Sequence, residues 1–188
     1  MAKEEQLDII KLIQEGALHN ELDYERALIA ERKLRLLAKK DPGYIPERKK
    51  LRDIIEAWEK ENWSADADIS DEKIRESDLA EEIALEEMLF INRRKKIIKQ
   101  KLKGYGLTQQ DLGVILGHNN KSYISELMNG IIPFSMKDLI NIHRILKIEL
   151  KDLVPTFLSH DERVRIKYSI DKLNNPKVKL NKDDLALV

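Results

Sequence analysis

The stretch GLTQQDLGVILGHNNKSYISELMNGIIPFS, residues 106–135, constrains the fold of this chain more than any other segment. Polar residues that cap helix N-termini recur in it, each just ahead of a run with helical apolar spacing. These caps are Thr108, Asn119 or Asn120, and Ser135. Gly117 and Gly130 follow the first two runs, where a left-handed backbone ends a helix. The pattern predicts helices over 109–116 and 121–128 and a third helix after Ser135.

Gly113 lies inside the first predicted helix, where glycine costs about 1 kcal/mol relative to alanine. We interpret this cost as a sign that another segment packs too closely there for a side chain. The spacing Gln109-x3-Gly113-x3-Gly117-x6-Ile124 describes two short helices, a tight turn and an apolar plug. This is the helix-turn-helix geometry, whose second helix lies in the DNA major groove. Six residues separate Gly117 from Ile124, which predicts a turn one residue longer than the usual five.

The residue types at the start of the second helix suit DNA. Lysine bonds guanine or phosphate, serine donates to either, and tyrosine contacts a thymine methyl or a phosphate. The start of the first helix suits the phosphate backbone, because its free N–H groups and dipole favour an anion. The candidate DNA-binding residues are Thr108, Gln109, Asn120, Lys121, Ser122, Tyr123, Ser125 and Glu126. The alternative is an ordinary corner between two helices with a polar surface; the spacing, the caps and the local basicity favour DNA binding.

Charge is unevenly distributed although the formal net charge is zero. Residues 64–90 contain ten acidic and two basic residues, whereas residues 91–151 contain twelve basic and four acidic residues. A basic module is the electrostatic footprint expected of a phosphate-binding surface. Charge runs also occur simply as solvated helix faces, so this pattern supports DNA binding without deciding it.

The remainder of the chain has predominantly helical spacing, and the scarcity of glycine and proline favours an all-α fold. We expect an N-terminal helical domain over 1–63, with helices at 4–15 and 23–40, a turn at DPGY and a helix around 51–58. Residues 64–80 are interpreted as an acidic linker, residues 81–155 as a five-helix DNA-binding domain, and residues 156–188 as a tail. In the tail, RVRIKYSI (163–170) alternates apolar and polar residues, which predicts a half-buried β-strand, and KVKL (177–180) suggests another.

Composition argues against several function classes. The chain has no cysteines, so disulfides, thiol catalysis and cysteine-ligated zinc are excluded. Its four histidines are dispersed without zinc-site spacing, and no phosphate-binding glycine loop is present. We therefore expect no enzyme activity, cofactor or metal. The sequence has neither a bilayer-spanning apolar run nor a signal-peptide pattern at its start, and a cytoplasmic setting is expected.

With these motifs identified, residues 93–155 resemble the XRE-type, phage-repressor-like helix-turn-helix family. The segment NKSYISELMNG (120–130) is similar to the recognition segment of HigA-type antitoxins, including the elongated turn. The segments DYERALIAERKLRLLAKKDPG and LRDIIEAWEKE are similar to the paired helices that precede the DNA-binding domain in that family. The resemblance covers about two thirds of the chain.

The resemblance implies an antitoxin. Such a protein neutralises a small basic toxin of the HigB (RelE-like) type, an mRNA endonuclease, by direct binding. It also binds its own operator DNA as a homodimer and represses its operon. Tyr24, Leu28, Ile54 and Trp58 match family positions, but their periodicity indicates core. Acids expected to be exposed nearby are better candidates for a basic toxin, namely Glu21, Glu25, Glu56 and Glu59.

Several alternatives remain open at this stage. The acidic segment 66–87 is an equally good toxin contact, or it lies against the chain's own basic module. The strand predicted at 163–170 pairs with its symmetry mate or with the toxin. The competing function is a plain XRE-family transcriptional regulator whose N-terminal helices bind another protein or a ligand. A third class is an interaction scaffold that binds no DNA.

Overall fold

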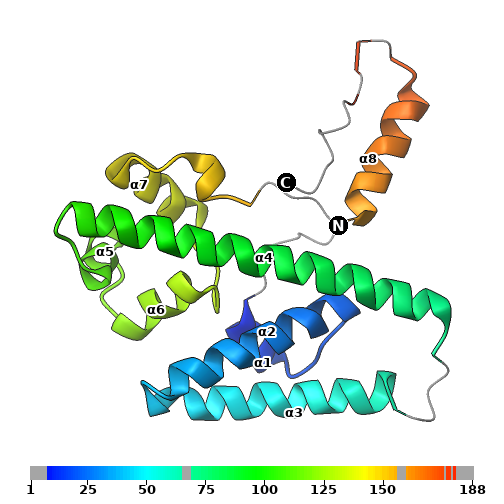
Figure 1. Cartoon of the computed structure of the whole chain (residues 1–188), viewed down its shortest axis with the longest axis horizontal. Helices are drawn as coiled ribbons and strands as arrows, with labels where there is room; N and C mark the ends of the chain where they lie inside the picture. The colour runs from blue at the N-terminus through cyan, green and yellow to red at the C-terminus, as the bar shows by residue number, and fades with distance from the viewer. Residues whose placement is uncertain (1–7, 65–68, 156–159, 176, 179, 181–188) are drawn as a thin grey trace. The chain divides into compact units, whose positions relative to one another are not determined.

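The computed structural model describes residues 8–64, 69–155, 160–175, 177–178 and 180, and these form helices joined by turns, without a strand (Figure 1). The all-α prediction is thus confirmed for the described residues. The N-terminal helices are α1 (Ile9–Glu15), α2 (Glu21–Ala38), the 3-10 turn η1 (Pro42–Tyr44) and α3 (Ile45–Asn62). They are followed by α4 (Asp71–Gly104), α5 (Gln109–Leu116), α6 (Lys121–Asn129), α7 (Met136–Leu146), the 3-10 turn η2 (Leu150–Asp152) and α8 (His160–Leu173). Among these helices, none carries an apolar run long enough to cross a bilayer.

The N-terminal helices form where the sequence places caps and turns. Asp8 caps α1, Gly16 ends it in the left-handed region, and Asn20 caps α2. The predicted DPGY turn is η1, in which the Asp41 carboxylate accepts a hydrogen bond from the Gly43 N–H at 3.0 Å. A shared core is formed by buried residues that include Leu34, Leu51 and Ile55 together with Ile131 from the turn after α6.

Helix α4 corrects the predicted domain boundaries. Ser70 caps it, so residues 71–80, interpreted as an acidic linker, are its first turns. Acidic residues in the first turn stabilise a helix through its dipole, and the acidity that indicated a linker fits a helix start equally well. Arg26 of α2 pairs with Glu87 of α4, and α2 lies along the N-terminal half of α4. Residues 1–63 and 81–155 are therefore not separated: residues up to Leu153 form one compact unit, and residues from Val154 form another.

The C-terminal half of α4 packs with α5, α6, α7 and η2. In residues 81–155, all described, we find four α-helices and the short η2 in place of five full helices. Arg94 is buried in this core, where its guanidinium lies against the rings of Phe90 and Phe134 and donates to the Leu153 carbonyl at 3.1 Å. Burial lowers the pKa of Arg94 to about 10. Arg94 thus joins α4 to the segment between α6 and α7 and to the end of η2.

The strand prediction for 163–170 is wrong, because this segment lies within helix α8. An alternating pattern also contains residues four apart, which share one face of a helix. Ile166 and Ile170 form such a pair and are half-buried, while Val164 and Tyr168 are exposed. Of the second predicted strand, Lys177 and Val178 are not in a strand, and Lys179 lies outside the described residues.

Candidate nucleic-acid interface

Two capped helices form the candidate interface. Thr108 and Asp111 make a capping box at α5: the Asp111 N–H donates to the Thr108 hydroxyl at 3.1 Å, and the Thr108 N–H donates to the Asp111 carboxylate at 2.7 Å. These bonds lower the pKa of Asp111. At α6, the Asn120 side-chain oxygen accepts from the N–H groups of Ser122 and Tyr123 at 2.8 and 3.3 Å. Both helix starts predicted from the sequence are confirmed.

The helix crossing explains Gly113. A Cβ at this position would lie 2.7 Å from the His118 carbonyl oxygen and 3.6 Å from the Ile124 Cβ. His118 in turn donates its N–H to the Gly113 carbonyl at 2.7 Å. Ile124 is 1% exposed and fills the predicted plug position. The turn begins at Gly117, whose φ of 84° lies in the left-handed region.

The buried carboxylate of Asp138 links the turn between α5 and α6 to α7. Asp138 completes a capping box with Ser135 through one oxygen, and its other oxygen lies 3.1 Å from His118 Nε2. The His118 ring also contacts the Tyr123 ring at a centroid distance of 4.9 Å. The elongated turn between α5 and α6 is therefore held by side-chain contacts at both ends.

Comparison with known proteins bears on this geometry. Residues 98–153 match a protein-family model, HTH_3, described as helix-turn-helix. Residues 98–153 are an XRE-family helix-turn-helix domain. Such a domain implies DNA binding and transcriptional regulation. No curated protein and no solved structure gave a significant match to the chain.

The helix-turn-helix domain exposes some of its predicted DNA-binding residues. Lys121 and Tyr123 stand exposed at the start of α6, and the Tyr123 side chain is 37% exposed. Asn120 and Thr108 are exposed too, but their side chains are engaged as caps. Gln109 is half-buried and lines a shallow groove with Lys99 and Lys103 of α4. Lysines beside the start of α5 suit a phosphate group.

The other predicted residues of α6 face the N-terminal helices. Ser122, Ser125 and Glu126 are half-buried on one side of α6. Tyr44 of η1 is buried against that side, with its hydroxyl among these three residues but without hydrogen-bonding geometry to any described residue. Burial, and then Glu126, raises the pKa of Tyr44; burial likewise raises the pKa of Glu126. Part of the predicted reading face is thus covered.

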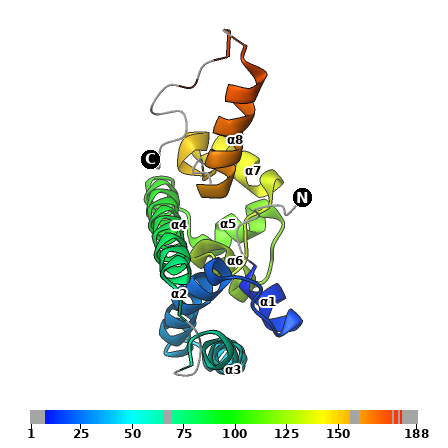
Figure 2. The ribbon, with the colours of Figure 1, turned by 90° about the vertical axis from the view of Figure 1, so that its right-hand side faces the viewer.

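The N-terminal helices and α4 also lie next to the C-terminal end of α6 (Figures 1 and 2). Lys33 of α2 donates to the Asn129 carbonyl at 3.1 Å, and Lys95 of α4 donates to the Asn129 side chain at 2.5 Å. The Ile9 N–H donates to the Ile131 carbonyl at 2.9 Å. These contacts could not be predicted from the sequence, because Tyr44 and Lys33 lie some 80 to 100 residues from their partners on α6 and no local pattern links them.

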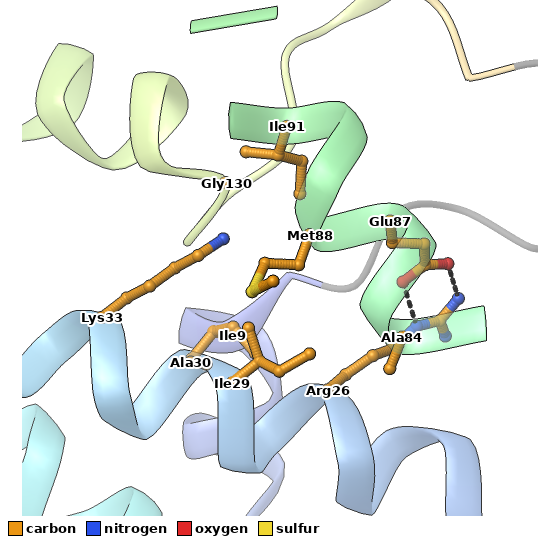
Figure 3. A pocket seen from close by; sticks show the side chains of 10 residues that line it. All are labelled: Ile9, Arg26, Ile29, Ala30, Lys33, Ala84, Glu87, Met88, Ile91 and Gly130. Atoms are coloured by element: carbon orange, nitrogen blue, oxygen red, sulfur yellow. Dashed lines mark hydrogen bonds and ion pairs between the residues drawn. The ribbon is translucent and has the colours of Figure 1, made fainter. Parts of the chain in front are cut away.

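A small pocket lies where α1, α2, α4 and the end of α6 meet (Figure 3). Lys33 points into it, and burial together with the nearby charges of Lys95 and Arg94 lowers the pKa of Lys33 to about 8. Gly130 closes one side, where a Cβ would lie 2.8 Å from the Ile91 Cδ1. The helix-turn-helix domain and the N-terminal helices therefore meet in a closely packed contact.

The four predicted toxin-binding acids do not form one exposed surface. The expectation that Glu21 is exposed is wrong: it is buried and accepts a hydrogen bond from Trp63 Nε1 at 3.0 Å. Glu59 is half-buried and accepts from the Tyr24 hydroxyl at 2.9 Å. Glu25 is half-buried, and burial, followed by the charge of Glu81, raises its pKa. Glu56 is exposed and pairs with Arg52 at 3.0 Å.

Proposed function

We propose that this protein is a sequence-specific DNA-binding transcriptional regulator that inserts the start of α6 into the major groove. The observation that carries the proposal is the exposed pair Lys121 and Tyr123 on a helix that is capped, anchored and closely packed against α5. A rigid first turn positions side chains for base edges better than a mobile loop. Gln109 and the free N–H groups at the start of α5 supply phosphate contacts beside it.

Lys121 and Tyr123 make the first contacts in this proposal. Ser122 and Ser125 reach bases only when Tyr44 moves away from α6, because the cover lies on their side. The N-terminal helices thereby limit how deeply α6 enters the groove. The regulator would bind DNA as a homodimer, since one recognition helix reads only half of a two-fold site.

The proposed binding is tested by selecting DNA from a random pool and measuring affinity by fluorescence anisotropy. Lys121→Ala is expected to reduce the preference for the selected sequence by about 1–3 kcal/mol. Lys50→Ala, which removes the same charge from an exposed position on α3, is the matched control and should leave the preference unchanged. An unchanged preference in Lys121→Ala would remove this residue from the proposed reading surface.

We further propose that the regulated operon encodes a partner that the N-terminal helices neutralise, as in a type II toxin-antitoxin pair. The similarity of segments 23–43 and 51–61 to HigA-type antitoxins supports this finer assignment. A toxin of the HigB or RelE-like type is basic, and exposed acids on α3, such as Glu56 and Glu61, suit it. Because the same helices cover part of α6, a partner bound to them would also alter DNA binding.

The plain regulator is the alternative, because the family match is confined to residues 98–153. The two functions are separated by expressing the product of any adjacent gene for a small basic protein, alone and together with this chain. Toxicity that co-expression relieves supports the antitoxin. If that product is harmless, or if no such gene is adjacent, the antitoxin function is ruled out and the DNA-binding regulator remains.

A further inference from the structure

Helix α4 presents an exposed stripe along the side opposite its packed face. The stripe follows two seven-residue series that lie side by side on a helix, and every member is exposed. The members are Asp71, Asp78, Leu85, Asn92 and Lys99 in one series and Arg75, Glu82, Leu89, Lys96 and Lys103 in the other. In the end-on view of Figure 2, the other helices of the first unit lie on one side of α4.

The stripe is apolar at its centre. Leu85 and Leu89 lie on either side of the midpoint of α4 and are 47% and 57% exposed. Ile74 and Leu79, 44% and 37% exposed, flank its acidic end. These two leucines, one helical turn apart, form a small apolar patch at the centre of an otherwise charged stripe.

The charges of the stripe change sign across this centre. Asp71, Asp78 and Glu82 precede the leucines, with Arg75 as the one base among them, whereas Lys96, Lys99 and Lys103 follow. A parallel partner helix of the same sequence would place like charges together. An antiparallel copy places opposite charges together, and this reversal selects one orientation.

We propose that two copies of this chain associate through antiparallel α4 helices, with the two-fold axis near Glu87 and the Leu85–Leu89 pair at its centre. This register places Leu85 opposite Leu89 of the second copy, Asp78 opposite its Lys96, and Asp71 opposite its Lys103. Each pair recurs by symmetry, as an isologous interface requires. The Arg75–Lys99 pair, which also occurs twice, brings two bases together and makes the contact weaker than a fully complementary one.

This surface deepens the homodimeric regulator proposed above by naming the face it uses, and its test requires no DNA. Failure of the interface would therefore remove this face from the dimer but leave the contacts of α6 with a half-site, and failure of DNA binding would leave the interface untouched. The pairing covers the side of α4 opposite its packed face, so the recognition helix stays accessible in the dimer. Lys99 and Lys103 face the second copy in this register, and Gln109 and the start of α5 remain open to a phosphate group.

Charge reversal tests the register in the full-length chain by sedimentation velocity over a range of concentrations. Asp78→Lys alone and Lys96→Asp alone are each expected to weaken association about tenfold or more, because two attractive layers become repulsive. The double variant restores the pairing and association. Asp53→Lys, an equal charge change on exposed α3, is the control. A monomer at every concentration, or equal dimerisation in all variants, would overturn the proposal.

Disulfide formation supplies a second readout, because the chain contains no cysteine. A mixture of Asp78→Cys and Lys96→Cys chains should form a cross-linked pair under mild oxidation. Asp78→Cys alone should not, because the two copies of residue 78 are 18 residues apart along the paired helices, about 27 Å. Equal cross-linking of Asp78→Cys with itself would contradict the antiparallel register.

Discussion

At the residue scale, the side chain of Gly113 is a single hydrogen atom, and this small size lets α5 pack closely against the turn and α6. A methyl group there would meet the His118 carbonyl, which is backbone and cannot move aside without disturbing the turn. We expect Gly113→Ala to lower the free energy of unfolding by about 2 kcal/mol or more, against the usual helix preference for alanine. Urea denaturation measures this change. Gly104→Ala is the control, since a Cβ there meets nothing within 4 Å, and it should be neutral or slightly stabilising.

Lys33 makes stability depend on pH. The pKa of Lys33 is about 8 in the folded chain and 10.5 in the unfolded chain. Below pH 8 the buried side chain is charged, and the folded state then bears the whole cost of burying that charge. Between these two pH values the unfolded chain binds one proton more than the folded chain. The free energy of unfolding therefore rises with pH, by about 3 kcal/mol. Urea denaturation across this range should show the rise in the native chain and lose it in Lys33→Met. Lys50→Met, at an exposed site, should keep it.

At the element scale, the contact between η1 and α6 is expected to limit DNA binding. Tyr44→Ala removes the ring that covers α6 and should raise DNA affinity several-fold, because less contact must break. Tyr44→Phe removes only the hydroxyl and keeps the ring that covers α6, so its DNA affinity should stay below that of Tyr44→Ala. Anisotropy titrations compare both with Tyr168→Ala, an exposed ring on α8. Equal affinities for the two Tyr44 variants would show that the contact does not control binding.

The sequence predicted some elements closely because their signals are local. The bounds of α5 and the start of α6 follow from Thr108, Gly117 and Asn120, whose side chains or backbone act within one turn. The start of α4 at Asp71 was not predicted, because acidic residues suit both a linker and a helix start. The alternation in 163–170 likewise fits either a strand or one face of a helix.

The arrangement of these elements was beyond local patterns. Tyr44 in a surface turn and Lys33 within α2 carry no sign that they meet α6. Glutamate is usually exposed, yet Glu21 is buried and accepts a hydrogen bond from Trp63, which lies 42 residues later in the chain. The assignment of DNA-reading residues on α6 stays a prediction, and the cover over Ser122, Ser125 and Glu126 was not expected from the sequence.

At the scale of the whole molecule, residues up to Leu153 should unfold as one body, since α4 spans both the N-terminal helices and the helix-turn-helix domain. Both tryptophans, Trp58 and Trp63, report on the N-terminal helices. A fluorophore on Val114→Cys, a 63% exposed site on α5, reports on the other end. The two urea transitions should coincide within error. Separate midpoints would show that the two parts fold independently.

The central claim is that the start of α6 lies in the DNA major groove, and a tethered cleavage reagent tests it most directly. The reagent is attached to Asn119→Cys, an exposed residue just ahead of α6 in a chain with no other cysteine. The comparison chain carries it on Leu36→Cys, an exposed position of α2. We predict strand cleavage confined to a few base pairs within the selected site from residue 119 and much weaker, diffuse cleavage from residue 36. Focused cleavage from residue 36 with none from residue 119 would contradict the account.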